Sequence, residues 1–116
     1  MTNADFEKIV DTSDEWITTR TGIKERRIAS ADEATSDMAV AACRNALEMA
    51  SVANEEIDML IVGTVTPDYR LPSCACVVQE KMGLPNAMAF DIVSACTGFI
   101  NGLSIAQSFI ESGKYK

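Results

Sequence analysis

Met59-Leu-Ile-Val-Gly-Thr-Val65 is a continuous, mostly apolar run that directly follows Asp58. A strand that is buried on both faces has this composition, and such strands belong to parallel sheets. A second short run of the same kind covers residues 87–93. Helical patterns precede, separate and follow the two runs. The sequence therefore predicts an α/β fold in which helices are layered on a mostly parallel sheet.

Helices are expected on both sides of these strands, and most of them have recognisable end signals. They cover about residues 4–10, 13–21, 35–53, 73–82 and 97–112. Thr2 or Asn3 can cap the first helix. Thr12 and Glu15 have capping-box spacing for the second helix, which Gly22 is placed to end. Residues 23–34 are predicted as a charged loop with a short extended piece at 27–29, and residues 67–72 as a second loop.

The long helix at 35–53 is predicted to begin at Thr35 or Ser36. Its apolar residues recur at roughly helical spacing, which predicts one face packed against the rest of the fold. The predicted face contains Met38, Ala42, Leu47 and Ala50.

The chain has 116 residues, which supports at most one domain. A chain of this length can bury roughly two thirds of its unfolded surface. Two strands alone make a poor parallel sheet, however. The chain also opens directly on a helix and stops where its last helix should lead into another strand. We therefore expect residues 1–116 to be a partial domain of a longer polypeptide.

Charge and composition exclude several classes of protein. Ten Lys and Arg residues stand against 17 Asp and Glu residues, and the net charge of −7 argues against nucleic acid as a partner. There is no run of about 18 apolar residues, so no membrane-spanning helix is expected. The polar, acidic first residues do not resemble a signal peptide, which favours a cytoplasmic location.

The absence of histidine narrows the possible chemistry. Neither a Ser-His-Asp nor a Cys-His pair can be completed within the chain, and no His-ligated metal site can form. The four cysteines contain no C-x-x-C spacing, so we expect neither a zinc site nor, in the cytoplasm, a disulfide.

Cys96 is the candidate nucleophile, because it lies between the strand at 87–93 and the helix at 97–112. A helix N-terminus favours the thiolate form of a cysteine. Gly98 would let a substrate approach the backbone, and the amide of Cys96 itself could donate to an oxyanion. These features suit acyl transfer through a thioester. The alternative is that Cys96 is a small buried apolar residue, as many free cysteines are.

The other three cysteines are predicted to be packing residues. Cys43 falls within the long helix beside alanines. Cys74 and Cys76 lie at the start of the helix at 73–82, where they point to different faces.

A basic and aromatic patch surrounds Trp16, the one tryptophan of the chain. Four of the ten basic residues fall within Arg20–Arg27, and the i, i+4 spacing places Trp16 and Arg20 on one helix face. A ring beside a guanidinium suits an adenine next to phosphate, as in coenzyme A. The alternative is a core tryptophan beside a solvated loop that is partly salt-bridged through Glu15 and Glu25.

Several stretches of the chain together resemble one known family in a single register. They are Thr2-Asn-Ala-Asp5, Ile9-Val-Asp-Thr-Ser-Asp-Glu-Trp-Ile17, Arg20-Thr-Gly-Ile23, Arg27-Ile-Ala29, Pro72-Ser73 and Ala89-Phe-Asp-Ile-Val-Ser-Ala-Cys-Thr-Gly-Phe99. The resemblance is to β-ketoacyl-acyl carrier protein synthase III, and it covers essentially the whole chain. The combination DTSDEWI…RTGI carries most of its specificity.

This resemblance implies a thiolase-like fold and a homodimeric transferase of fatty acid synthesis. The cysteine matching Cys96 would take an acyl group from acetyl-CoA or another short acyl-CoA. Malonyl-acyl carrier protein would then lose carbon dioxide, and the resulting carbanion would attack the acyl-enzyme. The covalent intermediate divides the reaction into two easier steps. Acyl-CoA enters as a substrate, and no cofactor is implied.

The resemblance also implies roles for substrate-binding residues. Trp16 matches a tryptophan that stacks on the adenine of CoA, and Arg20 matches an arginine that holds the same end of the molecule. Thr12 and Thr21 match positions that line that site. Leu71 matches a loop position that contributes to the acyl pocket of the partner subunit.

Family members have about three hundred residues and a Cys-His-Asn triad, whereas this sequence contains no histidine. The isolated chain is therefore expected to be inactive even if its parent polypeptide is a synthase. The open alternative is a non-catalytic module that binds acyl-CoA or mediates dimerisation. A hydroxymethylglutaryl-CoA synthase is a further possibility within the enzyme class, against which the DTSDEWI…RTGI match argues.

Overall fold

The computed structural model describes residues 1–115. The chain divides into two compact units, residues 1–32 and the chain from Glu33 onward. The sequence predicts that residues 1–116 are part of one domain that further residues of a longer polypeptide complete. The two units of this chain do not test that, so it stays a prediction. Within the described residues, none of the helices has the length and apolar character needed to cross a membrane.

The first unit contains two short helices, α1 (Asn3–Phe6) and α2 (Asp14–Thr21). Asn3 is buried between them, and its Nδ2 donates to Asp14 Oδ1 and to the Ile23 carbonyl, both at 2.8 Å. The chain then returns to its start, where Thr2 forms an antiparallel bridge with Glu25. Residues 27–29 form no strand, and the bridge at Glu25 lies just before them, so the short extended piece expected there stays a prediction.

The helix ends of this unit follow local capping chemistry. Thr2 caps α1 through a capping box with Asp5, and the helix is shorter than the predicted 4–10 because the chain continues in turns. Ser13 caps α2 instead of the expected Thr12, since its extended backbone places Oγ 3.0 Å from the amide of Trp16. Gly22 ends α2 in the left-handed region (φ 72°), as predicted.

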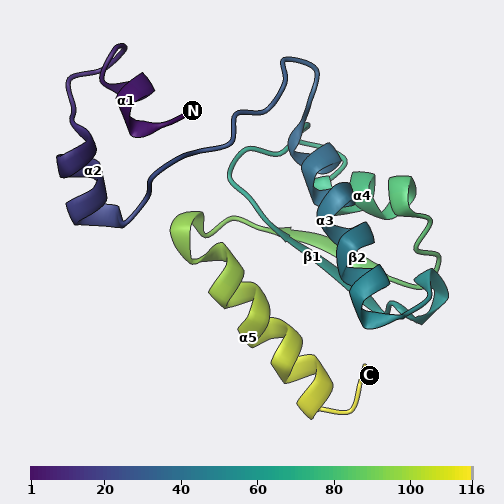
Figure 1. Ribbon diagram of the computed structural model, residues 1–116. Helices are drawn as coiled ribbons and strands as arrows, with labels where there is room; N and C mark the ends of the chain where they lie inside the picture. The colour runs from purple at the N-terminus through teal and green to yellow at the C-terminus, as the bar shows by residue number, and fades with distance from the viewer. Residues whose placement is uncertain (116) are drawn as a thin grey trace. The chain divides into compact units, whose positions relative to one another are not determined.

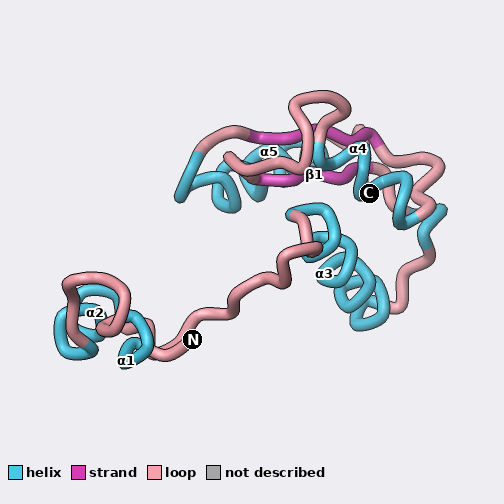
Figure 2. The backbone as a smooth tube through the Cα atoms, turned by 90° about the horizontal axis from the view of Figure 1, so that it is seen from above, coloured by secondary structure: helices cyan, strands magenta, loops and turns pink. Residues whose placement is uncertain are grey.

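The second unit is built on a two-stranded parallel sheet. Strand β1 (Met59–Gly63) pairs with β2 (Met88–Ile92) in a register that runs from Met59 opposite Met88 to Gly63 opposite Ile92. The two strands lie side by side in both views (Figure 1, Figure 2). Three α-helices accompany them, namely α3 (Thr35–Ala50), α4 (Cys74–Met82) and α5 (Gly98–Glu111), with short 3₁₀ turns η1 (Asn54–Glu56) and η2 (Ala95–Thr97). The predicted α/β class and parallel pairing are confirmed.

Helices cover both faces of the sheet. Leu60 and Val62 of β1 face a core that α3 and α4 complete. The alternate residues Met59, Ile61 and Gly63 face α5. In Figure 1, α5 accordingly lies on one side of the strands, and α3 and α4 on the other. The residues of β1 are half-buried and not fully buried as expected, and Gly63 is exposed.

The packed face of α3 differs from the predicted one. Val40 is buried, and Cys43 and Leu47 pack against the core, so the face follows spacings of three and four residues. Met38 is 48% exposed, and Ala42 and Ala50 are exposed as well. Of the predicted face, only Leu47 packs against this core. The spacing of the other three residues turns them away from it.

Polar side chains tie α4 and its flanking loop into the unit. The carboxylate of Asp91 on β2 accepts hydrogen bonds from the amides of Cys74 and Ala75 at 2.8 and 2.7 Å. Ser73 caps the same helix through the amide of Cys76. At the other end, Gln79 Nε2 donates to the carbonyls of Leu84 and Ala87. Helix α4 is therefore fixed to β2 at its start and to the loop that leads into β2 at its end.

Candidate functional site

Cys96 lies on the sharp turn η2, directly between β2 and α5. It is exposed, so the alternative that it is a buried apolar residue is wrong. Ala95 just before it has a positive φ of 43°, which is unfavourable for a residue with a Cβ and costs roughly 1–3 kcal/mol. Such a strained strand-to-helix turn presents a nucleophile at the end of a strand. The sequence carried no signal for this strain.

Hydrogen bonds and a close backbone contact hold this turn. The amide and hydroxyl of Thr97 both donate to the Ser94 carbonyl, at 3.0 and 2.8 Å. Gly98 is buried against Gly63, and an ideal Cβ on Gly98 would stand 3.4 Å from the Gly63 Cα. The close backbone approach that sequence analysis assigned to a substrate at Gly98 is thus made with β1.

The thiols of the other three cysteines are less exposed to solvent than that of Cys96. Cys74 is fully buried, and Cys43 and Cys76 are half-buried within helices, as predicted for packing residues. Burial raises the pKa of the Cys43 thiol. Burial also raises the pKa of Cys74, with a further contribution from the negative charge of Asp68. These two thiols are therefore kept protonated, which makes them poor nucleophiles.

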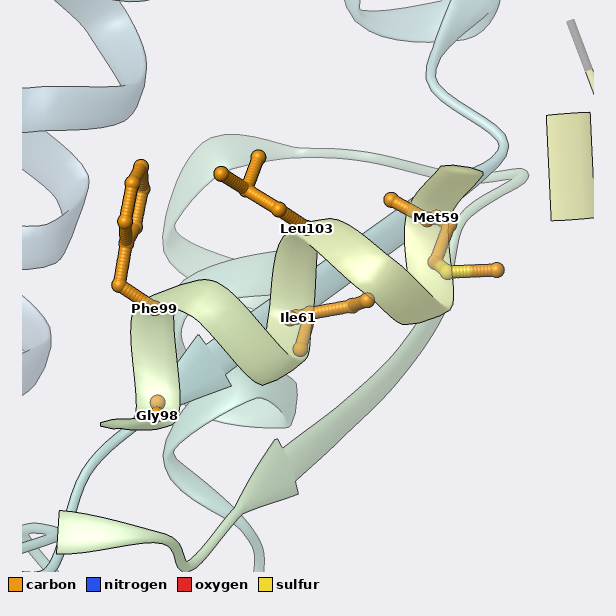
Figure 3. Close-up of a pocket in the computed structure, with 8 residues that line it drawn as sticks. Met59, Ile61, Gly98, Phe99 and Leu103 are labelled. Carbon is orange, nitrogen blue, oxygen red and sulfur yellow. The ribbon is translucent and has the colours of Figure 1, made fainter. Parts of the chain in front are cut away.

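An apolar groove runs between β1 and α5, with a volume of about 250 Å³. Met59 and Ile61 line it from the strand, and Phe99 and Leu103 line it from the helix (Figure 3). Phe99 and Leu103 project from the same side of α5, and Phe99 is 74% exposed. Cys96 does not line the groove, although the groove begins at Gly98, two residues further along the chain. Sequence reasoning did not single out this groove.

The Trp16 patch of the first unit is exposed on the surface. The indole of Trp16 is 55% exposed, so the alternative of a core tryptophan is wrong. The Arg20 guanidinium lies 5.0 Å from the ring centroid, as the i, i+4 spacing predicts. One hollow of about 530 Å³ is lined by Ser13, Glu15, Trp16, Thr19 and Arg20. A flat ring and a cation therefore border an open, polar depression.

Thr12 and Thr21, which the resemblance places near this patch, have different surroundings. Thr12 lines a second hollow of about 340 Å³ together with Asp11, Ser13 and Trp16. The Thr21 hydroxyl donates to the Ile17 carbonyl at 2.7 Å and accepts from the amide of Ile23. Its hydrogen bonds therefore join the last turn of α2 to the residues that follow the helix.

The remaining basic residues of the patch have partners of their own. Arg27 pairs with Glu25 at 2.8 Å, which agrees with the salt-bridged loop of the alternative interpretation. Arg26 lies over the ring of Phe6, and Lys24 Nζ donates to Thr18 Oγ1. Among the four, Arg20 is the one whose guanidinium lies over Trp16.

Leu71 lies in the loop between β1 and α4 and is 86% exposed. The loop at 67–72 is confirmed. Cys96 and Leu71 belong to the second unit, whereas Trp16, Arg20, Thr12 and Thr21 belong to the first.

Comparison with known proteins gives a consistent result. Residues 90–116, which include Cys96, match the family model of 3-oxoacyl-[acyl-carrier-protein] synthase III. A curated relative from Caldanaerobacter subterraneus subsp. tengcongensis, the β-ketoacyl-[acyl-carrier-protein] synthase III, is 61% identical over all 116 residues. The chain is similar to β-ketoacyl-[acyl-carrier-protein] synthase III along its whole length. The resemblance found in the sequence is thereby confirmed.

Solved structures extend this similarity to the fold. The 3-oxoacyl-[acyl-carrier-protein] synthase III from Aquifex aeolicus VF5 superposes with a TM-score of 0.91 at 57% identity, and the match covers all of this chain and 37% of that one. The priming β-ketosynthase of the R1128 polyketide pathway gives a TM-score of 0.90 at 42% identity and is covered to 35%. The thiolase-like fold is therefore confirmed for this chain. The chain spans about a third of the length of the curated synthase III relatives it matches (35% for the Caldanaerobacter relative).

Proposed function

We propose that the polypeptide carrying this chain is a β-ketoacyl-acyl carrier protein synthase III and that Cys96 is its nucleophile. The observation that carries the proposal is the exposed position of Cys96 on the strained turn after β2, inside the segment that matches the family model. The similarity to named synthases supports the same assignment.

The proposed reaction begins with acyl transfer. The Cys96 thiolate attacks the thioester carbonyl of acetyl-CoA or another short acyl-CoA, and the tetrahedral intermediate collapses with loss of the CoA thiolate, which takes up a proton. Malonyl-acyl carrier protein then loses carbon dioxide, and its carbanion attacks the acyl-Cys96 thioester. The products are 3-oxoacyl-acyl carrier protein and the free Cys96 thiolate. Acyl-CoA supplies the activated group, and the proposal involves no metal or other cofactor.

Binding of the CoA end is assigned to the Trp16 patch. The exposed indole offers a stacking surface for adenine, and the Arg20 guanidinium offers charge-assisted hydrogen bonds to phosphate. Thr12 borders the same ring from the adjacent hollow. Thr21 acts through the end of α2, which carries Arg20.

We further propose that the active protein is a cytoplasmic homodimer in which Leu71 reaches the acyl pocket of the partner subunit. Its 86% exposure supports a contact outside this chain. The sequence contains no histidine, so the proton-transfer groups of the Cys-His-Asn triad must come from outside these residues, and the isolated chain should be inactive. Neither nucleic acid nor a membrane enters the proposal.

The absence of histidine also favours a second candidate, a non-catalytic module that binds acyl-CoA or mediates dimerisation. The two functions are separated by assaying 3-oxoacyl-acyl carrier protein formation from acetyl-CoA and malonyl-acyl carrier protein. A synthase forms the product, Cys96→Ser abolishes it, and Cys43→Ser retains it. Tight acyl-CoA binding without product, from the polypeptide as it occurs in cells, would support the module.

A further inference from the structure

The loop from Thr64 to Ser73 carries Leu71 on a backbone that is anchored at several points. The Thr64 amide donates to the Ile92 carbonyl of β2, and Asp91 fixes the amides that follow Ser73. Between these ends, Thr35 Oγ1 donates to the Thr66 carbonyl at 2.6 Å. The loop is therefore held against both the sheet and α3 while the Leu71 side chain stays exposed.

Asp68 is a further anchor of this loop. Helix α3 begins after Ala34, which has no side-chain acceptor for the first amides of the helix. Asp68 supplies the missing acceptor from a distant part of the chain. Its Oδ1 accepts from the Ser36 amide at 2.9 Å, and its Oδ2 accepts from the Ser36 hydroxyl. Ser36 is completely buried and Asp68 is half-buried, so the donor end of both hydrogen bonds is shielded from water.

Lys81 of α4 completes this network. Its Nζ donates to Ser36 Oγ and to Asp37 Oδ1, both at 2.7 Å. The Ser36 hydroxyl thus accepts from a cation while it donates to a carboxylate, which fixes its direction. The network therefore links three parts of the unit, the start of α3, helix α4 and the loop at Asp68. Asp68 lies three residues before Leu71 in the chain.

We propose that Asp68 is a positioning residue for Leu71 and thereby influences which acyl chains the site accepts. This inference rests on the proposed function, since it takes Leu71 as part of an acyl pocket. An exposed leucine on a loose loop would turn toward nearby apolar surface. The hydrogen bonds that Asp68 accepts from Ser36 hold the backbone three residues before Leu71 and so limit how far the segment that carries Leu71 can move.

The test compares Asp68→Ala with the wild type in the polypeptide that carries this chain. Trypsin cleavage after Arg70 reports the mobility of the loop, because Arg70 is exposed and lies between Asp68 and Leu71. Two hydrogen bonds to a charged group are lost, so cleavage should be about tenfold faster or more. Glu80→Ala is the matched control, since it removes an exposed carboxylate next to Lys81 on α4.

The second readout is acyl selectivity, the ratio of kcat/KM for acetyl-CoA to that for butyryl-CoA. We expect Asp68→Ala to change this ratio by about threefold to tenfold and Glu80→Ala to leave it unchanged. Asp68→Asn keeps one acceptor for the Ser36 amide and should give intermediate values in both assays. If Asp68→Ala does not fold, Asp68→Asn is compared with the wild type in its place.

Faster cleavage together with altered selectivity would support the inference. An active wild-type enzyme whose selectivity is the same in both Asp68 variants would overturn it. A wild-type polypeptide that forms no 3-oxoacyl product would instead overturn the proposed function, and the role in selectivity with it.

Discussion

Gly63 and Gly98 meet backbone to backbone, so that a Cβ on Gly63 would stand 3.1 Å from the Gly98 carbonyl carbon. This contact joins the end of β1 to the first residue of α5. Cys96 precedes that residue by two positions on the strained turn, so the same contact fixes the place of the candidate nucleophile.

Gly63→Ala should therefore destabilise the fold and slow acylation of Cys96. The added methyl group meets backbone atoms that cannot move independently, and such overpacking costs about 1–3 kcal/mol. Gly102→Ala is the control, because its nearest neighbours are the side chains of Ile61 and Ile92 at 3.8 Å. Chemical denaturation should show a loss for Gly63→Ala and no loss for Gly102→Ala. Equal stabilities would contradict this account of the contact.

Alkylation should distinguish the four thiols. With a limiting amount of iodoacetamide near neutral pH, Cys96 should react first because it is exposed. Cys74 should react last, since it is fully buried and its pKa is raised. Peptide mapping by mass spectrometry measures the order. Modification of Cys74 before Cys96 in the folded protein would refute the assignment of Cys96 as the accessible thiol.

Trp16→Ala should weaken binding of CoA by about 1–3 kcal/mol, which is the scale of stacking between an aromatic side chain and a base. Trp16→Phe keeps a ring and should lose less. Arg20→Gln should also weaken binding, because it removes the cation beside the indole. Titration calorimetry measures all three affinities. Unchanged affinity in Trp16→Ala would show that the exposed ring serves another purpose.

The network around Asp68 predicts a pH dependence of stability. Hydrogen bonds from Ser36 lower the pKa of Asp68, and the hydrogen bond from Lys81 lowers the pKa of Asp37. A carboxyl group whose pKa is depressed on folding stabilises the protein above its unfolded pKa, about 3.9, and this stabilisation is lost as the pH falls through the folded value. The temperature at the midpoint of thermal unfolding, Tm, should therefore fall as the pH is lowered below about 4.

Lys81 acts in the opposite direction, because its hydrogen bond to Asp37 raises its pKa. Its contribution to stability is complete below the unfolded lysine pKa of about 10.4 and is lost as the pH rises through the higher folded value.

The acid limb of the Tm profile is tested with Asp68→Asn, which should flatten it. Glu80→Gln should leave the acid limb unchanged. An acid limb that is the same in Asp68→Asn and the wild type would assign the effect to other carboxyl groups.

Much of the fold could be predicted from local patterns. The apolar runs gave both strands to within two residues, and Gly22 and Gly83 end their helices in the left-handed region as glycine allows. The pairing of Trp16 with Arg20 followed from helical spacing alone. These features depend on residues that are neighbours in the sequence.

The features that escaped prediction depend on distant contacts or on backbone strain. Asp68 caps α3 from 32 residues away, so nothing near Ala34 indicates where the acceptor comes from. The positive φ of Ala95 is imposed by the turn between β2 and α5, since alanine has no preference for that conformation. The exposure of Cys96 could not be decided from sequence, because both a buried and an exposed thiol fit the junction of a strand and a helix.

The most direct test of the central claim is to locate the acyl group after the polypeptide is incubated with radiolabelled acetyl-CoA alone. We predict that the label is stable to denaturation, maps to the peptide containing Cys96, disappears in Cys96→Ser and persists in Cys43→Ser. Acetyl-CoA that binds without transferring its acyl group, or label retained in Cys96→Ser, would contradict the assignment of Cys96 as the nucleophile.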